Sequence, residues 1–538
     1  MGTTIKPFGW LGSYEGFQIL HSCTVRSSGP PALQRIVLAP ADIVLRCKLY
    51  WSPAFCLIIP GRVVFDELVR AATDLVTVCP VIAGRLDLTP PVSIRLGGEA
   101  SGITVSEASW PNSNSKEFEA RCTHYCACPP PHDAADEGFL PAPPYEDPIE
   151  SKEGCSGNSP LFKLRLTHLG DGSSLLTASW SHALTDGSRA TEILNALALL
   201  YQGQSLESAS KIVALTERNL WPTHLRPHLE AVSKTTDNPS FSDAGPESQE
   251  DLRAPSPYAI GRHGSARSAM LTHLWNGYNG EAHLNFTVHI SQDDIIKLKA
   301  GLKGMPALAE VPFFSTNDVI TGLAWLLACD ARGRPRPGQK AQGEQNKGFV
   351  LVEYSKRGMP NGLIPTGYVG NLTESVAAVC TSDGSLQTQP HTGTSLMHSL
   401  LVAVCSIRKA ILQTLEPNWG LQTLAKGLAH QKAADFHKFV AAVHAVDHDI
   451  RLTNWNTFNN QTDFGFGKTT HMSGYFRMAG ADLCCVVQRL DGNGVGLRFE
   501  STWAGYERVL GSPVLPCLAP TSGVPQALQD VLNLHAAE

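Results

Sequence analysis

Residues 160–187 read PLFKLRLTHLGDGSSLLTASWSHALTDG, and this stretch decides the fold. Apolar residues alternate with polar ones from Phe162 to Leu166, which predicts a β-strand with one wet face. The Asp-Gly pair at 171–172 separates this run from SSLLTASW, and such a pair between two strand-like runs is typical of a β-hairpin. Apolar residues then recur at helical spacing over 188–201. The alternation of strands and helices predicts a mixed α/β architecture.

Two further helices have clear boundaries in the sequence. Apolar residues recur at helical spacing over 65–79, and Pro80 ends that run. A second helix is predicted near 317–330, because Ser315 and Asp318 have the spacing of a capping box. The α/β pattern therefore extends through both halves of the chain.

Three polar stretches interrupt this pattern. Residues 106–158 are rich in Pro, Ser, Asp and Glu, which predicts a long surface excursion. Residues 204–280 show little periodicity and are the best candidate for an interdomain linker, and 333–348 are predicted to form a loop. Between these stretches, PVIAGRLDL at 80–88 predicts a short strand and HLNFTVHI at 283–290 predicts a longer one.

Length and composition restrict the class of protein. The 538 residues suggest two to four domains and contain 43% hydrophobic residues, enough for a large core. The net charge is −6, so the sequence does not have the excess of basic residues that is typical of a nucleic-acid-binding protein. No apolar run suggests a membrane span, and the first residues do not resemble a secretory signal. Fourteen cysteines without an export signal predict free thiols and a cytoplasmic protein.

The strongest local signal for chemistry is SWSHALTDGSRA at 179–190. His182 follows a predicted strand and precedes a predicted helix, a position where a turn can hold a side chain rigidly and still present it to a cleft. A neutral imidazole can take a proton from a hydroxyl or amine at cellular pH. Asp186 follows four residues later, and Gly187 allows a close backbone approach. The alternative is a helix N-terminus with an aspartate cap and an incidental histidine.

The second signal is TDFGFGK at 462–468, which follows LTNW at 452–455. An Asp-Phe-Gly motif holds magnesium in protein kinases, but the sequence has no H-R-D loop upstream and no Gly-rich phosphate loop near the N-terminus. A kinase is therefore not predicted. The alternative interpretation is a glycine-containing turn with two aromatic anchors.

The two signals, in this order and about 280 residues apart, resemble the H-x-x-x-D-G and D-F-G-W-G motifs of the BAHD acyltransferases, which use acyl-CoA. The resemblance spans residues from about 40 to 500. Three other stretches are similar to segments of that family: PVIAGRL at 80–86, STNDVITGLAWLLACDAR at 315–332 and GYVGN at 367–371. The sequence departs from the family at Phe466, where members carry Trp, at Thr469, where plant members carry Pro, and at EYSKR 353–357, which replaces D-G-R-S-R.

The resemblance implies a fold and a domain plan. The family has two similar-sized α/β domains of the chloramphenicol-acetyltransferase-like kind, each a mixed β-sheet with flanking helices. A long crossover linker joins them, and a channel passes between them. For this chain we expect a first domain at 1–210 carrying HALTDG, a linker at 211–280 and a second domain at 281–538 carrying DFGFG.

The resemblance also implies roles in catalysis. His182 is expected to lie midway along the channel and to deprotonate the hydroxyl or amine of a small-molecule acceptor. The acceptor then attacks the thioester of acyl-CoA directly, through a tetrahedral intermediate. Trp455 and Thr453 match family positions that act at the oxyanion, and an indole N–H or a hydroxyl suits that task.

Other motif residues are expected to be structural. By resemblance, Asp186 points away from the channel and pairs with an arginine of the other domain, for which Arg357 in EYSKR is the candidate. Gly187 belongs to the same motif. In the second motif, Asp463, Gly465 and Gly467 are expected to form a loop that supports the CoA side of the channel without touching reacting atoms.

No permanent cofactor or metal is predicted, and the resemblance does not identify the residues that contact CoA. CTHYCAC at 122–128 gathers Cys and His, but its spacing favours free thiols over zinc. Lys468 could meet a CoA phosphate, although a solvated lysine is the simpler interpretation. The expected partners are acyl-CoA and an alcohol or amine acceptor, and the family is mostly monomeric.

Two other functions remain open. Condensation-type enzymes take acyl groups from carrier proteins and share H-x-x-x-D-G, but they usually carry a second histidine where this chain has Ser181. They also usually sit beside carrier modules, and none is visible in the sequence. A non-catalytic binding protein on the same scaffold would be expected to lose the histidine, and His182 is present.

Overall fold

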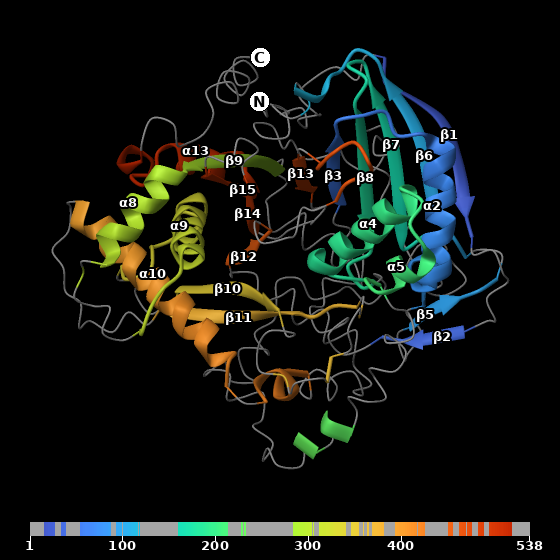
Figure 1. Cartoon of the computed structure of the whole chain (residues 1–538). Helices are drawn as coiled ribbons and strands as arrows, with labels where there is room; N and C mark the ends of the chain where they lie inside the picture. The colour runs from blue at the N-terminus through green and yellow to red at the C-terminus, as the bar shows by residue number, and fades with distance from the viewer. Residues whose placement is uncertain are drawn as a thin grey trace, which may run out of the picture.

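The structure is a computed structural model, which describes residues 16–26, 34–38, 54–87, 93–98, 101–116, 118, 160–213, 227–229, 231–232, 283–303, 305, 311–339, 346–353, 359, 363–364, 368, 370–380, 393–416, 418–424, 450–455, 462–469, 471–475, 483–488 and 494–518. Two six-stranded sheets dominate the fold (Figure 1).

The first sheet has the strand order β1-β6-β7-β8-β3-β13. Its strands are β1 (Gln18–Val25), β3 (Ala54–Ile59), β6 (Ile103–Trp110), β7 (Phe162–Leu169), β8 (Ser174–Trp180) and β13 (His471–Tyr475). The β6–β7 pair is parallel and the other pairs are antiparallel. Helices α2 (Phe65–Val78), α4 (Gly187–Tyr201) and α5 (Leu206–Ser210) cover one face of the sheet (Figure 1) and share one hydrophobic core with it.

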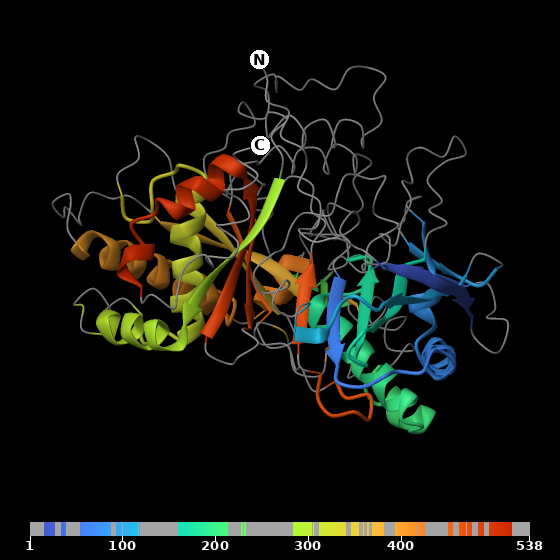
Figure 2. The ribbon, with the colours of Figure 1, turned by 90° about the horizontal axis from the view of Figure 1, so that it is seen from above.

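The second sheet has the order β11-β10-β12-β14-β15-β9. Its strands are β9 (His283–Ser291), β10 (Asn346–Glu353), β11 (Thr373–Cys380), β12 (Ile450–Asn454), β14 (Leu483–Gln488) and β15 (Gly494–Thr502). Helices α8 (Gln292–Lys303), α9 (Thr316–Ala331), α10 (Gly393–Gln413) and α13 (Trp503–Leu510) pack against it in a separate hydrophobic core. Figure 2 shows these helices grouped around the second sheet, apart from those of the first.

A small antiparallel sheet adjoins the first core. Its order is β2-β5-β4, with β2 at Gln34–Val37, β4 at Arg85–Asp87 and β5 at Ser93–Leu96. A short 3₁₀ helix, Pro80–Ala83, leads from α2 into β4. The predicted mixed α/β architecture is therefore confirmed, with two mixed sheets and flanking helices.

One strand from the second half of the sequence joins the first sheet. β13 follows the DFGFG stretch and pairs antiparallel with β3, His471 opposite Ile58 and Tyr475 opposite Ala54. Trp455 and Phe464, which precede β13, also belong to the first hydrophobic core. The domain boundaries expected from the sequence stay a prediction, but the chain around 462–475 lies with the first sheet rather than the second.

Several predicted elements are confirmed. The helices expected at 65–79, 188–201 and 317–330 are α2, α4 and α9, and Ser315 and Asp318 form the expected capping box. The hairpin is present, since β7 and β8 pair antiparallel. In its turn, Asp171 accepts hydrogen bonds from Ser115 and Ser173, and these outweigh burial and hold the pKa of its carboxyl well below the usual range.

Five expectations were wrong in part. β7 was expected to have one wet face, but all its residues are buried except Lys163, which is half-buried. Helix α5 lies within the stretch 204–280 that was expected to be an interdomain linker, and its Ala209 belongs to the first hydrophobic core.

Residues 106–110 look polar in sequence but belong to β6. Pairing with β1 on one side and β7 on the other satisfies the backbone hydrogen bonds of this strand. The strand expected to begin at residue 80 is a 3₁₀ turn followed by β4 over residues 85–87. The loop expected over 333–348 ends earlier, since β10 begins at Asn346.

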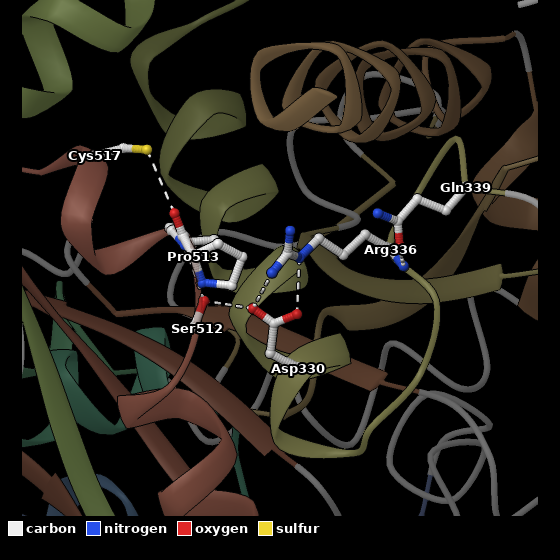
Figure 3. A network of polar contacts seen from close by, with 7 residues as sticks. Asp330, Arg336, Gln339, Ser512, Pro513 and Cys517 are labelled. Carbon is white, nitrogen blue, oxygen red and sulfur yellow. Dashed lines mark hydrogen bonds and ion pairs between the residues drawn. The ribbon is translucent and has the colours of Figure 1, made fainter. Parts of the chain in front are cut away.

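A polar network fixes the chain that leaves α9 (Figure 3). Arg336 donates two hydrogen bonds to the carboxylate of Asp330, from Nε at 2.8 Å and Nη2 at 2.9 Å. Ser512 donates to the same carboxylate at 2.5 Å, which links this loop to the segment after α13. Planar, two-point contacts of this kind are among the stronger ion pairs.

Helix α10 contains a stretch, Leu396–Gln413, that is long and apolar enough to cross a membrane by length and composition, with a mean hydropathy of 1.3. Buried residues make up 56% of it, and the helix packs on α9 and β11. A core helix has the same composition, so the one such helix in the described part of the chain is weak evidence for a span.

A buried ion pair joins α9 to α10. Asp318 accepts hydrogen bonds from Nε and Nη2 of Arg408, and both side chains are buried. The same carboxylate oxygen accepts the backbone N–H of Ser315 at 2.5 Å, and the Phe313 ring lies 4.6 Å from the guanidinium carbon of Arg408. The pair therefore links a helix cap to the neighbouring helix.

We predict that Asp318→Ala lowers the free energy of unfolding by about 3–5 kcal/mol, because it leaves the Arg408 guanidinium buried without its carboxylate. Urea unfolding followed by circular dichroism measures this. Lys211→Ala is the control, since Lys211 and Glu207 form an exposed pair at 3.1 Å whose loss costs at most about 1 kcal/mol. Equal losses in the two variants would contradict the assignment.

Candidate active site

His182 lies in a tight turn between β8 and α4, with its side chain 7% exposed. The Trp180 indole N–H donates to the carbonyl of Thr185 at 3.2 Å and spans the turn. The backbone N–H of Leu184 donates to Ser181 O at 2.9 Å within it. The turn is thus fixed by its own hydrogen bonds, and the histidine is held where a strand of the first sheet ends.

Asn371, two residues before β11 of the second sheet, holds the imidazole of His182. The amide Nδ2 of Asn371 donates to the backbone carbonyl of His182 at 2.8 Å, and His182 Nδ1 lies 3.0 Å from Asn371 Oδ1. A carbonyl only accepts, so the first bond fixes which end of the amide is oxygen. That oxygen also only accepts, so Nδ1 carries the proton. The lone pair of the neutral ring is therefore on Nε2.

Asp186 ties the same two segments together a turn later. One carboxylate oxygen accepts the backbone N–H of Arg189 at 3.0 Å and caps α4. The other oxygen accepts the backbone N–H of Leu372 at 2.8 Å. Asp186, Asn371 and Leu372 are all buried. The turn that carries His182 is thus fastened to the start of β11 at two consecutive residues.

The DFGFG stretch packs against the other end of α4. Gln202 donates to the carbonyl of Asp463 at 2.6 Å, and Thr462 donates to Asn195 at 2.6 Å. Within the loop, Asp463 accepts the N–H of Gly465 at 2.7 Å. Gly465 and Gly467 have φ values of +90° and +91°, which side chains other than glycine rarely adopt.

The two phenylalanines of this loop differ in environment. Phe464 is buried and makes an edge-to-face contact with Tyr201 at 5.6 Å. The Tyr201 hydroxyl accepts the N–H of Val64 at 2.9 Å, and burial raises the pKa of this phenol. Phe466, where the family carries Trp, is 40% exposed and lies directly against Gly61. The interpretation as a glycine turn with two aromatic anchors therefore describes the geometry of the loop.

Thr453 lies near the end of β12, and Trp455 is the residue just after that strand. Trp455 is buried in the first hydrophobic core, edge-to-face with Phe55 at 5.0 Å, and Phe55 packs on Trp180 at 4.6 Å. Leu452 beside Thr453 faces the second core, so Thr453 is on the opposite face of the sheet. Trp455 thus packs beside Phe55 in the first core, and an oxyanion role for Thr453 and Trp455 stays a prediction.

Some predicted residues are not placed. Arg357 and the 122–128 cysteine and histidine group lie outside the described residues, so the Asp186–Arg357 pair is untested. Gly187 begins α4. Lys468 forms an isolated bridge with Asp463 at the base of the DFGFG loop. Among the described residues, no group of three His, Cys, Asp or Glu side chains could hold a metal ion.

The residue that sequence reasoning missed is Asn371. It is the last letter of GYVGN, a stretch noted only for its resemblance to the family. Its contact with His182 joins residues 189 positions apart, so no local spacing indicates it. The available signal was an asparagine at the end of the GYVGN stretch. That residue type alone does not indicate which side chain it contacts.

Comparisons with known proteins identify the family of the chain and match its fold. The model of a family described as "Transferase family" matches residues 18–498. Among solved structures, vinorine synthase superposes with a TM-score of 0.55 at 12% identity, covering 91% of this chain and 96% of its own. F. graminearum TRI101 in complex with coenzyme A and deoxynivalenol gives 0.60 at 12% identity, covering 91% and 100%. No curated protein matches the chain by sequence.

The two-sheet α/β fold is of the chloramphenicol-acetyltransferase-like kind. The chain belongs to the transferase family of the BAHD acyltransferase type. Acyltransferase activity in the general sense follows from that membership.

We predict that Asp186→Ala lowers the free energy of unfolding by about 2–4 kcal/mol. Loss of a helix N-cap costs about 0.5–2 kcal/mol, and the buried N–H of Leu372 loses its acceptor at about 1–3 kcal/mol more. Ser205→Ala is the control, because Ser205 caps the exposed helix α5 and fastens no second segment. Thermal or urea unfolding of both variants measures the difference, and equal losses would show that the bond to Leu372 contributes nothing.

Proposed function

We propose that the protein transfers an acyl group from acyl-CoA to a hydroxyl, or amine, of a small-molecule acceptor, with His182 as the general base. The observation that carries this proposal is the bond from His182 Nδ1 to Asn371 Oδ1, which places the basic lone pair on Nε2. The TRI101 structures are complexes with coenzyme A and either T-2 mycotoxin or deoxynivalenol, and this supports acyl-CoA as the donor class for this chain. CoA acts as a co-substrate, and no permanently bound cofactor is proposed.

The chemistry needs one proton carrier. Nε2 of His182 takes the proton of the acceptor hydroxyl while its oxygen attacks the thioester carbonyl carbon. The C–O bond forms, the carbonyl becomes a tetrahedral oxyanion, and the C–S bond then breaks as the carbonyl returns. The proton on the imidazolium passes to the departing thiolate. The ring ends in the state in which it began, so one histidine serves as base and then as acid.

Asn371 is proposed as a positioning residue for this ring. Its two hydrogen bonds hold the imidazole plane and the backbone of the turn at once. A neutral amide stabilises the imidazolium less than a carboxylate would, so the ring returns its proton readily. Asp186 acts further out, by fastening the turn to Leu372.

The oxyanion requires a donor in addition to the base. Thr453 and Trp455 are proposed for this role on the strength of the family resemblance, with Thr453 on the sheet face turned away from the second core. Arg357 is proposed as the ion-pair partner of Asp186. A channel between the two halves, a cytoplasmic location and a monomeric state are likewise proposed.

His182→Ala is expected to lower the rate of thiol release from acyl-CoA by about 10²–10⁴, the usual contribution of a positioned general base. A thiol-reactive dye follows release across a panel of acyl-CoAs and alcohols. The control is His168→Gln, since His168 is another buried histidine of the first sheet and bonds to Glu107 at 2.8 Å. Full activity of His182→Ala would refute the base assignment.

The same panel separates the other functions. A condensation-type enzyme would release no thiol from free acyl-CoA but would act on acyl groups carried by a carrier protein. A binding protein would act on neither substrate. Mass spectrometry of the acylated product distinguishes esters from amides.

Asn371→Leu is expected to lower kcat by about 10-fold, or ~1.4 kcal/mol of barrier, because the ring loses the acceptor that sets its tautomer. Asn371→Asp keeps an oxygen facing Nδ1 but adds a charge that favours the imidazolium. The acid limb of its kcat/KM profile should therefore move to higher pH. A structural residue with no effect on the ring would leave the position of that limb unchanged.

A further inference from the structure

A tyrosine ring packs directly on the backbone that leads into Asn371. Asn371 is the last residue of the GYVGN stretch, which also contains Tyr368 and Gly370, and all three are buried. A β-carbon at position 370 would overlap the hydroxyl oxygen and Cζ of Tyr368 and would lie 2.7 Å from its Cε1. Carbon atoms in contact are about 3.5–4.0 Å apart, so no side chain fits between this ring and the backbone.

The Tyr368 ring has no room to move away from Gly370. It belongs to a hydrophobic cluster, named here the Tyr368 cluster, whose buried members come from three distant stretches of the chain. These members are Leu229, Tyr368, Leu372, Leu421 and Leu424. Protein interiors are close-packed and transmit strain, so the ring cannot retreat without displacing its leucine neighbours.

The Tyr368 cluster anchors the chain on both sides of Asn371. On one side the Tyr368 ring covers Gly370, and on the other the side chain of Leu372 is itself a member of the cluster. The backbone N–H of Leu372 also donates to Asp186 at 2.8 Å. The amide that contacts His182 at 2.8 and 3.0 Å therefore stands on backbone that the cluster fixes at each end.

We infer that Tyr368 is a positioning residue that acts through Asn371. Its ring fixes the backbone at Gly370, and this keeps the Asn371 amide in contact with the imidazole of His182. A side chain at position 370 must displace either the ring or the Asn371 backbone. The effect on catalysis rests on the proposed role of His182 as the base, whereas the effect on the orientation of its ring does not.

The first test adds a methyl group at position 370. Gly370→Ala is expected to remove the preference of the neutral His182 ring for a proton on Nδ1, as measured by ¹⁵N NMR of histidine-labelled protein. Its kcat should fall by about 10-fold at most, which is the loss expected for Asn371→Leu. Gly505→Ala is the matched control, because a β-carbon there would overlap Ser501 Oγ in the second half of the chain. It should leave the tautomer of His182 unchanged.

The second test removes the ring and then restores it. Tyr368→Leu is expected to lose the same tautomer preference, and Tyr368→Phe is expected to retain it, because the ring carbons also press on Gly370. Tyr506→Leu removes another buried tyrosine, which packs on Phe286 in the second core, and should leave His182 unaffected. Loss of stability alone would move Tyr506→Leu as much as Tyr368→Leu, so this control separates positioning from general loosening.

A double variant shows whether the two positions act through one contact. Gly370→Ala should lower the melting temperature less in the Tyr368→Leu background than in the wild type, because the clashing ring is gone. An equal loss in both backgrounds would overturn the inference. So would an unchanged His182 tautomer in Tyr368→Leu, a measurement that does not require Gly370→Ala to fold.

The outcome for Tyr368 is distinguishable from the outcome for the proposed reaction. The tautomer and the melting temperature are measured without an acyl donor or acceptor. If the wild type released no thiol from any acyl-CoA while the Tyr368→Leu tautomer changed as expected, the acyltransferase proposal would fail and the positioning role of Tyr368 would stand.

Discussion

The pair of hydrogen bonds between His182 and Asn371 is the constraint on which the rest of the site depends. The bond from Asn371 Nδ2 to the His182 carbonyl orients the amide, so that Oδ1 faces the ring. The contact of that Oδ1 with His182 Nδ1 then orients the imidazole. His182 follows β8 of the first sheet and Asn371 precedes β11 of the second, so the pair of bonds also links the first half of the chain to the second. His182 is therefore positioned both by the hydrogen bonds within its own turn and by a contact from a distant segment of the chain.

Helix α4 extends this constraint across the first sheet. Asp186 caps its beginning and fastens it to Leu372, while Asn195 and Gln202 near its end hold the loop that contains Asp463. The two sequence motifs of the family thus meet opposite ends of one helix. The DFGFG stretch therefore supports helix α4, which follows His182. Strand β13, which comes after that stretch, forms the edge of the first sheet next to β3.

Sequence periodicity predicted the elements whose pattern is local. α4, α9 and the β7–β8 hairpin follow from apolar spacing, an aspartate cap and an Asp-Gly turn. β6 was misjudged because SEASW looks polar, yet its Glu107 forms a 2.8 Å hydrogen bond with His168 of the neighbouring strand. The position of β13 and the role of Asn371 were beyond prediction, since both depend on partners more than 180 residues away. Burial by distant residues leaves no mark on local spacing.

¹⁵N NMR of histidine-labelled protein measures the tautomer of His182, with His182→Ala to assign the signals. The neutral ring is expected to carry its proton on Nδ1 and its lone pair on Nε2, and this preference is expected to disappear in Asn371→Leu. A proton found on Nε2 of the wild-type ring would contradict it.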